Sequence, residues 1–496
     1  MWIASLLRTT LQFILWSPIV EWTGYDKACQ QIERSVSSAS AVFYSGESYK
    51  NDTAHWFGSS SQPSACSFEP GTAKDLGIAL QILGHTSTPF AVKGGGHTGN
   101  LGFSSTPGVQ IALTRFNETI YDPSSNTATV GAGQVWDQVY EALQDTGVNV
   151  VGARVTGVGV AGLTLGGGYS WLTNQYGLTI DTVTAFELAL TNGTVTWVTE
   201  SSHPDLFFGL KGGLNSFGVV TRFTLKTFPQ SDVWGGTITC YEPSVLDRFI
   251  DATENFLKNN KDPKAAIIAT LAYMAGQDDD DDDDDVKRVT GPLFNVLLFY
   301  DGPKQPKIFD EFVALGCGDS IGTRSFYEFI QYTLSDMSPR ERGVFDTISV
   351  LEYSDALIHA MANESKYWAN ELPDATFVAY NIEPFIPSLY NHNTTATAFP
   401  ASRGQAFFPS LIQFSWTRPE EDKKMQNAIR QSVATLQALA NKEHPTVANA
   451  SLYSNYAIYG TDVERIYGYE NVRKMREIKK EVDPKNVMDL TGGFKV

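Results

Sequence analysis

The spacing of hydrophobic and polar residues predicts alternating helices and strands along the chain. Apolar residues that recur every three or four positions predict amphipathic helices over 26–37, 72–83, 136–144, 245–257, 423–439 and 472–482. Short runs rich in β-branched and aromatic residues predict strands over 90–92, 109–113, 128–130, 148–151, 186–190, 195–198, 293–300 and 407–416. The pattern predicts a glycine-rich domain at 21–225, a larger domain of strands and helices at 226–455, and a tail at 456–496 that returns to the first domain.

Two segments stand outside this pattern. Residues 6–20 combine Arg8 with an apolar stretch that is too short to span a bilayer, for which ~20 apolar residues are needed. A weak secretory signal over residues 1–20 is one explanation, although no small-x-small cleavage site follows, and an ordinary N-terminal helix is the other. The run Asp278–Asp285 consists of like charges that repel each other, so we expect a solvated insert at 278–285 with no assigned function.

Composition narrows the classes of function. The chain has 496 residues, of which 42% are hydrophobic and 19% charged, which is typical of a globular protein with about two to four folding units. The net charge is −18, and it is still −10 when the eight residues of the aspartate run are left out. A protein that binds a phosphate backbone needs the opposite sign, so we expect no nucleic-acid partner, and we expect no membrane partner either. The 42 glycines are a first hint of a cofactor, because glycine lets the backbone approach a ligand closely.

Cysteines and glycosylation sequons favour an exported protein. The four cysteines are too few for a disulfide framework and fit no zinc motif, and proximity in sequence favours the pairs Cys29–Cys66 and Cys240–Cys317. Asn-x-Ser/Thr sequons occur at Asn51, Asn117, Asn192, Asn363, Asn393 and Asn449. We therefore expect secretion, or passage through the secretory pathway.

Three glycine-rich stretches carry most of the chemical information. The first, residues 92–98, reads VKGGGHT after a predicted strand, and its consecutive N–H groups can converge on an anion such as a pyrophosphate. It lacks the Gly-Lys-Ser/Thr ending of a P-loop. The second, residues 157–162, has the spacing G-x-G-x-x-G, and the third, residues 203–221, has a glycine pair before a strand-like exit.

The second stretch invites a Rossmann interpretation, which the neighbouring residues oppose. Asp181 follows about twenty residues later, as a dinucleotide site would require. The last glycine of that fingerprint must open a helix, however, and here Gly166, Gly167 and Gly168 follow almost at once. Each glycine costs a helix roughly 1 kcal/mol relative to alanine, so the sequence argues against an NAD site.

Together, in this order, the motifs resemble the flavin domain of the berberine-bridge-enzyme-like branch of the vanillyl-alcohol-oxidase/PCMH family of FAD-linked oxidases. The resemblance covers roughly residues 55–225 and resumes near the C-terminus, where residues 467–471 read YGYEN and residues 483–484 read DP. It implies an α+β fold with a two-part, PCMH-type FAD-binding domain. It also implies a substrate domain in which helices flank an antiparallel sheet.

The resemblance implies which residues hold the FAD. Gly94, Gly95, Gly96 and Thr98 would cradle the pyrophosphate, and His97 would be bonded covalently to the 8α-methyl group of the flavin. Such a tether should raise the reduction potential of the flavin. For an isolated histidine, a structural role would be the alternative. The other positions matched to cofactor contacts are Lys93, Gly133, Val155, Val158, Gly159, Gly162, Gly167, Gly168, Gly218, Val219 and Asn471.

One departure from the family pattern bears on function. Many members attach a second flavin position to a cysteine, and here that position is Val155, so we expect no 6-S-cysteinyl link. Doubly linked relatives tend to have open sites for oligosaccharides or bulky alkaloids, so the missing thiol weakens a sugar-oxidase interpretation. The small Val158 falls where the family gates dioxygen, which resembles oxidases that use O2 as acceptor. We expect no metal, since none of the seven histidines has a matching partner at ligand spacing in the sequence.

Oxidation of an alcohol or amine also needs a base for the departing proton. Residues 451–456 resemble the Tyr-x-Asn-Tyr strand of the family, which supplies Tyr453 and Tyr456 as catalytic candidates. Residues three apart on a strand should face opposite sides unless a bulge intervenes, so we expect one tyrosine to be catalytic, preferably Tyr456, and the other to be packed. A phenol of pKa about 10 needs a cation or a hydrogen-bond donor to act near neutrality. The alternative is that both tyrosines have only a structural role, packed in the core or at an interface.

The sequence thus predicts a covalent flavoprotein oxidase acting on a small-molecule substrate and producing H2O2, with secondary metabolism as one expected setting. A carbohydrate oxidase is the alternative within the fold. A flavin-binding or glycan-binding protein without turnover is the alternative from another class. The substrate and the oligomeric state stay open.

Overall fold

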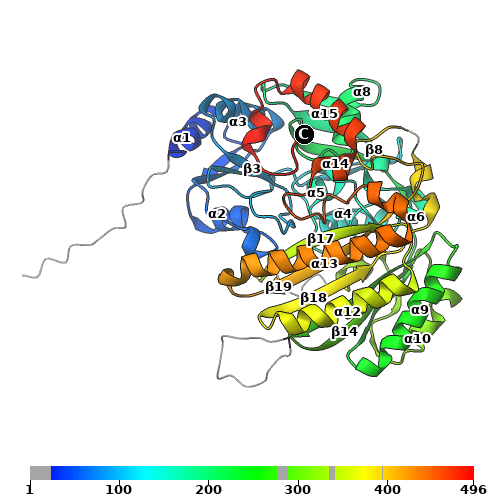
Figure 1. The fold of residues 1–496 in the computed structure, drawn as a ribbon. Coiled ribbons are helices and arrows are strands. Elements are labelled where there is room, and N and C mark those ends of the chain that lie inside the picture. Colours follow the sequence, from blue (N-terminus) through cyan, green and yellow to red (C-terminus); the bar gives the residue numbers. More distant parts are fainter. Residues whose placement is uncertain (1–23, 276–288, 334–340, 394) are drawn as a thin grey trace, which may run out of the picture.

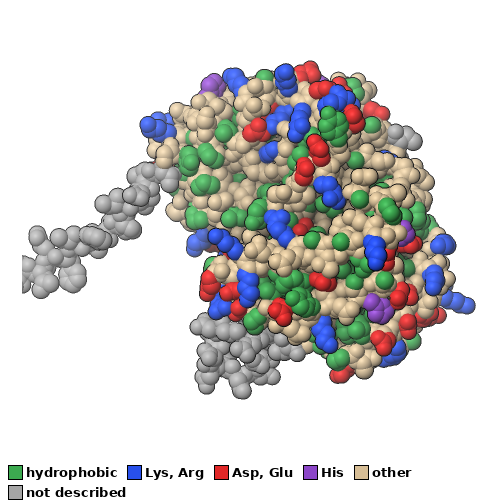
Figure 2. Space-filling model, in the orientation of Figure 1, with side chains coloured by type: hydrophobic (Ala, Val, Ile, Leu, Met, Phe, Trp, Pro, Cys, Tyr) green, Lys and Arg blue, Asp and Glu red, His purple; other side chains and the backbone are tan. Residues whose placement is uncertain are grey.

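The computed structural model describes residues 24–275, 289–333, 341–393 and 395–496 and has the predicted α+β fold (Figure 1). The predicted leader at 1–20 and the aspartate run at 278–285 lie outside the described residues. No helix in the described ranges combines the length and the apolar character needed to cross a bilayer. Acidic and basic side chains are interspersed over the face of the molecule shown in Figure 2.

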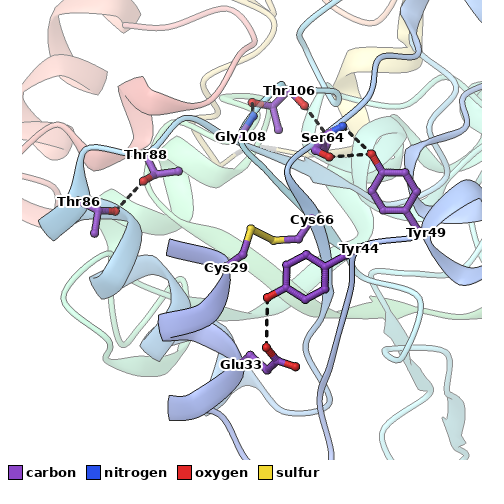
Figure 3. Close-up of a disulfide and its surroundings, with 10 residues drawn as sticks. All are labelled: Cys29, Glu33, Tyr44, Tyr49, Ser64, Cys66, Thr86, Thr88, Thr106 and Gly108. Carbon is purple, nitrogen blue, oxygen red and sulfur yellow. Dashed lines mark hydrogen bonds between the residues drawn. A yellow bond between two sulfur atoms is a disulfide. The ribbon is translucent and has the colours of Figure 1, made fainter. Parts of the chain in front are cut away.

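The N-terminal part contains a four-stranded sheet that carries the first glycine loop. Its strand order is β1 (Ala41–Phe43), β2 (Cys66–Glu69), β4 (Val109–Ala112) and β3 (Phe90–Lys93), and β2, β4 and β3 run parallel. The helices of this part are α1 (Asp26–Ser35), α2 (Gly46–Thr53) and α3 (Ala73–Thr86). Thr72 caps α3 by accepting a hydrogen bond from the Asp75 N–H at 3.0 Å, and Leu76, Leu80 and Leu83 are buried. The predicted disulfide Cys29–Cys66 is confirmed and joins α1 to β2 (Figure 3).

A second, antiparallel sheet completes the glycine-rich part. Its order is β5 (Thr119–Asp122), β6 (Thr127–Gly131), β10 (Val219–Lys226), β8 (Val183–Ala189) and β9 (Val195–Thr199). A separate pair joins β7 (Val148–Asn149) to β11 (Phe228–Pro229). The helices are α4 (Trp136–Leu143), α5 (Val160–Leu165), α6 (Thr173–Tyr176), α7 (Thr179–Thr182) and α8 (Pro204–Leu210).

The rest of the chain builds one large antiparallel sheet. Its order is β15 (Gly318–Asp319), β12 (Val233–Cys240), β14 (Val289–Tyr300), β13 (Ala265–Ala275), β18 (Ala375–Ile382), β19 (Phe408–Trp416) and β17 (Arg342–Val350), and β16 (Gly322–Arg324) also pairs with β12. The helices are α9 (Leu246–Asn259), α10 (Asp310–Val313), α11 (Phe326–Gln331), α12 (Asp355–Glu371) and α13 (Asp422–Glu443). Helices α12 and α13 cover one face, with α9 beside α12 (Figure 1), and the predicted disulfide Cys240–Cys317 is confirmed.

The C-terminal segment lies against the glycine-rich part. It contains α14 (Val463–Tyr467) and α15 (Tyr469–Val482), and α15 packs on α8. The Thr191 hydroxyl donates to Asp483 at 3.0 Å, and the Asn215 amide donates to the Gly492 carbonyl at 3.3 Å. Figure 1 shows this red segment beside the blue and cyan elements of the N-terminal part.

Two local predictions were wrong: that the glycines at 166–168 prevent a helix at the G-x-G-x-x-G stretch, and that residues 451–456 form a strand. A short helix, α5, follows Gly159 and ends at Leu165, directly before the run of three glycines at 166–168. Residues 451–456 form a turn and not a strand. The strand before the G-x-G-x-x-G stretch belongs to the antiparallel pair β7–β11, so the stretch does not lie in a Rossmann βαβ unit.

Candidate functional site

A cavity of about 400 Å³ lies between the glycine-rich part and the uncovered face of the large sheet. The loop after β3, the segment around α5 and the turn 453–456 form one side, and strands β13, β14, β18 and β19 form the other. Eleven of the predicted site residues line it: Gly94, Gly95, Gly96, His97, Thr98, Val155, Val158, Gly159, Gly162, Tyr453 and Tyr456. The fold therefore brings together residues that are far apart in the sequence.

The loop after β3 needs its glycines because it touches a second glycine segment. A Cβ atom on Gly95 would lie 2.5 Å from the Gly159 Cα, and one on Gly159 would lie 2.4 Å from the Gly95 nitrogen. Gly96 has a φ of +73°, which side chains rarely adopt. The two backbones thus meet without side chains, and the loop lies open to the cavity.

His97 lies in this loop with one ring nitrogen unpaired. Its Nδ1 atom is buried and has no hydrogen-bond partner among the described residues, and the ring centroid lies 4.6 Å from that of Trp56. Burial lowers the pKa of the His97 imidazole to about 4, so the ring is neutral near pH 7. A neutral ring with a free nitrogen at a cavity wall is what a flavin tether requires, and with the glycine loop beside it these residues fit FAD.

Val155 occupies the position matched to the second flavin attachment. It lines the cavity with an apolar side chain, and all four cysteines of the chain are paired in disulfides. No free thiol is therefore available to form a cysteinyl bond to the cofactor.

The strongest polar cluster in the cavity is one that sequence reasoning missed. The Arg154 guanidinium donates to Glu383 at 2.5 Å and to the Tyr456 hydroxyl oxygen at 2.6 Å, and that hydroxyl donates to Glu383 at 3.2 Å. Arg154 and Glu383 are both buried, with side chains 8% and 1% exposed. Arg154 directly precedes Val155, but the family motif assigned a role to Val155 and none to Arg154. Nothing local in the sequence marks Glu383, which follows the end of β18.

The surroundings shift the acidity of Tyr456 in opposite directions. Burial raises the pKa of its hydroxyl well above the usual range, and the Arg154 guanidinium partly offsets this rise. Glu383 opposes ionisation of the phenol, because a second negative charge would lie beside the first. The cluster therefore favours a neutral phenol that is already hydrogen-bonded to a carboxylate.

Tyr453 and Tyr456 face the same cavity, which corrects the expectation of opposite faces. The N–H groups of Tyr456 and Ala457 both donate to the Tyr453 carbonyl, at 3.0 Å each, so the backbone turns here. The two ring centroids are 4.8 Å apart. The Tyr453 hydroxyl accepts a hydrogen bond from Asn455 at 2.9 Å, and burial raises its pKa.

Seven residues predicted to contact the cofactor do not line the cavity: Lys93, Gly133, Gly167, Gly168, Gly218, Val219 and Asn471. The Lys93 amine donates to the Asn51 carbonyl at 2.6 Å, and the Asn471 amide donates to the carbonyls of Thr397 and Ala398. Lys93 thus contacts the end of α2, and Asn471 holds the loop at residues 397–398.

The other five of these residues shape the backbone. A Cβ atom on Gly133 would lie 1.9 Å from the Leu113 carbonyl oxygen, and one on Gly168 would lie 2.3 Å from the Thr179 hydroxyl. Gly167 has a φ of +124° and packs against Phe399. Gly218 precedes β10, and Val219 begins it by pairing with Ala189.

One group of side chains in the described ranges could hold a metal ion, away from the cavity. Ligand atoms of Glu254, Asp355 and His359 lie within 4.8 Å of one another, on α9 and α12. No sequence pattern marks this grouping, because Glu254 is distant in sequence from the other two residues. Asp355 and His359 are both exposed.

Comparisons with known proteins agree with this geometry. Residues 64–199 match the model of the FAD binding domain family. The FAD-dependent monooxygenase drtC of Aspergillus calidoustus is 29% identical over 489 residues, covering 95% of this chain and 90% of that protein. The FAD-dependent monooxygenase FUP4 of Fusarium proliferatum is 30% identical over 457 residues, covering 87% and 85%.

Solved structures share the fold at lower identity. A variant of BBE-like 1 from Physcomitrella patens superimposes with a TM-score of 0.73 at 20% identity, covering 93% of this chain and 97% of that one. Glucooligosaccharide oxidase from Acremonium strictum, described with a 6-S-cysteinyl, 8α-N1-histidyl FAD, gives a TM-score of 0.72 at 19% identity, covering 93% and 97%.

Proposed function

Because the chain belongs to the berberine-bridge-enzyme-like FAD-linked oxidoreductases of the vanillyl-alcohol-oxidase/PCMH family, we propose that it oxidises an alcohol, or a related amine, with O2 as the final acceptor. A bound FAD would supply the hydride acceptor for the substrate carbon and the route by which the electrons reach O2 to give H2O2. The chain's own residues must then bind the substrate, orient it and remove one proton.

The observation that carries this proposal is the cluster of Arg154, Glu383 and Tyr456. A substrate hydroxyl placed against Tyr456 gives its proton to the phenol oxygen, while the phenol proton moves to the Glu383 carboxylate along the existing 3.2 Å hydrogen bond. Arg154 stabilises the negative charge that passes through the phenol oxygen. The transfer needs no resting phenolate, which burial would disfavour.

We also propose that His97 carries the flavin covalently through Nδ1. This atom is unpaired and buried at the cavity wall, and the low pKa of the ring keeps the imidazole neutral. Acid precipitation of the purified protein should leave the yellow chromophore in the pellet. His97→Ala should release it to the supernatant, and colour retained in the His97→Ala pellet would contradict the tether.

One product analysis separates the candidate reactions. Oxidation lowers the product mass by two hydrogens and yields one H2O2 per turnover. The relatives are named monooxygenases, and insertion of oxygen would instead add 16 mass units, or 18 with ¹⁸O2. We expect the loss of two hydrogens, and a label in the product would overturn oxidation in favour of monooxygenation.

A panel of alcohols, amines and aldoses, mixed with the enzyme without oxygen, tests turnover itself. Bleaching of the flavin by a member of the panel supports an enzyme, and rapid return of colour on adding O2 supports an oxidase over a dehydrogenase. Bleaching by aldoses and cello-oligosaccharides alone would favour the carbohydrate oxidase. A flavin that no class of substrate bleaches would favour a binding protein.

We propose further that the chain passes through the secretory pathway. Support comes from the two disulfides and from the sequon residues, since Asn51, Asn117, Asn192, Asn363 and Asn449 are exposed and Asn393 is half-buried. Expression in a secreting fungal host should give a product that loses mass on endoglycosidase treatment. An unglycosylated product that stays inside the cell would contradict this route.

A further inference from the structure

The cavity face of the large sheet is arranged in rows that run across the strands. Along β18, the alternate residues Phe377, Ala379 and Asn381, followed by Glu383, all line the cavity. Alternate residues on a strand share one face and are about 7 Å apart. The distance of a lining residue of β18 from the cluster of Arg154, Glu383 and Tyr456 can therefore be estimated by counting alternate residues from Glu383.

The first row beyond Glu383 is polar and has an unused donor. Thr270 pairs with Asn295 on one side and with Asn381 on the other, which places the three side chains side by side. The Thr270 hydroxyl donates to the Asn381 Oδ1 at 2.8 Å. This leaves the two N–H donors of Asn381 Nδ2 without a bond to any described residue, on a residue whose Cα lies about 7 Å along the strand from that of Glu383.

The next two rows are mainly apolar. Ala272 pairs with Leu293 and Ala379, and Met274 pairs with Phe377. These five residues form a small hydrophobic cluster that is separate from the main core. Gln413 lies beside Ala379, and its amide donates to Ser415 at 3.2 Å. The wall is therefore mainly apolar from about 14 Å to about 20 Å beyond Glu383, and Gln413 is a polar lining side chain in the row of Ala379.

The charges of the lining disfavour an ionic substrate. Among the described lining residues, Arg154 and Glu383 are the ones with formal charge, and they pair with each other. The net charge of the wall is thus near zero, and His97 is neutral. A carboxylate or ammonium group on the substrate would lose its hydration without gaining an unpaired opposite charge.

We infer that the substrate is an uncharged, elongated molecule with three parts in this order: the reacting hydroxyl, an oxygen acceptor about 7 Å away, and a hydrocarbon tail. The acceptor binds the Asn381 amide, and the tail packs on Leu293, Ala379 and Phe377. This inference rests on the proposed function for the position of the reacting end. A sugar chain fits less well, because most of its hydroxyls would lie unpaired against Leu293, Ala379 and Phe377.

A series of 4-acylbenzyl alcohols tests the arrangement. The para carbonyl places an oxygen about 7 Å from the benzylic hydroxyl, and the acyl chain can be lengthened from acetyl to octanoyl to form the tail. The matched probes are 4-alkylbenzyl alcohols, which lack the carbonyl, 4-carboxybenzyl alcohol, which is charged, and cellobiose. Dissociation constants are measured without oxygen, from the shift that each probe causes in the flavin absorbance.

We expect affinity to rise at least twofold with each added methylene and the carbonyl series to bind about tenfold more tightly than the alkyl series. Asn381→Ala should abolish the carbonyl preference but keep the dependence on chain length. Phe377→Ala should weaken the dependence on chain length but keep the carbonyl preference. Tighter binding of cellobiose or the carboxylate, or affinity independent of chain length, would overturn the inference.

The same titrations separate this inference from the proposed function. If the series binds as expected but no member bleaches the flavin, the substrate geometry stands and the oxidase proposal fails. If aldoses bleach the flavin and the acyl series neither binds nor reacts, the oxidase proposal stands and the substrate geometry fails.

Discussion

Tyr456 is held by partners from both sides of the cavity, and this makes its role testable. Arg154 comes from the glycine-rich part, and Glu383 comes from the end of β18 in the large sheet. The sequence identified the tyrosine through the family motif, and it indicated that a phenol needs a cation or a hydrogen-bond donor nearby. It could not identify Arg154 as that group or Glu383 as the neighbouring carboxylate, because their contact depends on how the two parts pack.

Removing the phenol hydroxyl should slow the chemical step. We expect Tyr456→Phe to lower the rate of flavin reduction about 10²- to 10⁴-fold, because the proton acceptor is lost while the ring still packs. The measurement is anaerobic stopped-flow absorbance with the best substrate. Tyr459→Phe is the matched control, since Tyr459 is partly exposed and bonds Gln426 instead. A Tyr456→Phe rate equal to that of the control would remove Tyr456 from the mechanism.

Removing one partner of the buried ion pair should lower the free energy of unfolding more than replacing both partners. Glu383→Leu leaves the Arg154 charge buried without its partner, which we expect to lower the free energy of unfolding by about 3–5 kcal/mol. The double variant Arg154→Met/Glu383→Leu should recover much of that loss. Urea unfolding of the wild type, the single variant and the double variant measures these differences. A double variant less stable than the single one would contradict this account.

At the scale of elements, periodicity worked best where one face of a segment is buried. The predicted helices at 72–83 and 136–144 became α3 and α4, with Leu76, Leu80, Val139 and Leu143 buried. The strands β13 and β18 were missed, because one face packs under helices and the other lines the cavity, so apolar residues occur at nearly every position. Strands β12 and β17 were missed as well.

The contact between two glycine segments should tolerate no side chain. Gly95→Ala would push a methyl group to within 2.5 Å of the Gly159 Cα, so we expect the loop to shift and cofactor loading to fall sharply. Loading is read as the ratio of flavin to protein absorbance. At Gly318, where the nearest atom to a new Cβ is 3.8 Å away, the same substitution should change nothing. Equal loading of the two variants would mean that the loop adapts.

Strand β17 carries a buried carboxyl that should make stability depend on pH. Asp346 accepts hydrogen bonds from the N–H groups of Thr347 and Ile458, and burial raises its pKa to about 6, with Arg430 acting in the opposite direction. Between about pH 4 and pH 6 the folded state keeps a proton that the unfolded state has lost. Stability should therefore fall as pH rises through this window.

Asparagine at this position can accept the same two hydrogen bonds without ionising. We expect Asp346→Asn to stabilise the fold by up to about 3 kcal/mol at pH 8 and by almost nothing at pH 4. Urea unfolding at both values gives the difference. A stability difference that does not change with pH would show that the carboxyl titrates normally.

At the scale of the whole molecule, the sequence predicted the fold class and much of the cofactor side of the site, because contiguous motifs carry them. The substrate side depends on register between strands that are far apart in the chain, such as Thr270 with Asn381. No local pattern specifies that register, so the substrate could not be inferred before the strands were paired.

The disulfide Cys29–Cys66 fastens the first helix to the first parallel strand of the molecule. Closing a loop of 37 residues in sequence restrains the unfolded chain, so Cys29→Ser/Cys66→Ser should lower the free energy of unfolding by about 2–4 kcal/mol. Thiol titration of the denatured wild-type protein should find no free thiol before reduction and four afterwards. Free thiols before reduction would show that the bridges do not form.

The alternation along β18 assigns different tasks to neighbouring positions of one strand. A gene library that varies residues 377 and 379 while keeping Glu383 would alter which molecules enter without touching the group that receives their proton. Selectivity and reactivity in this scaffold could then be engineered one at a time.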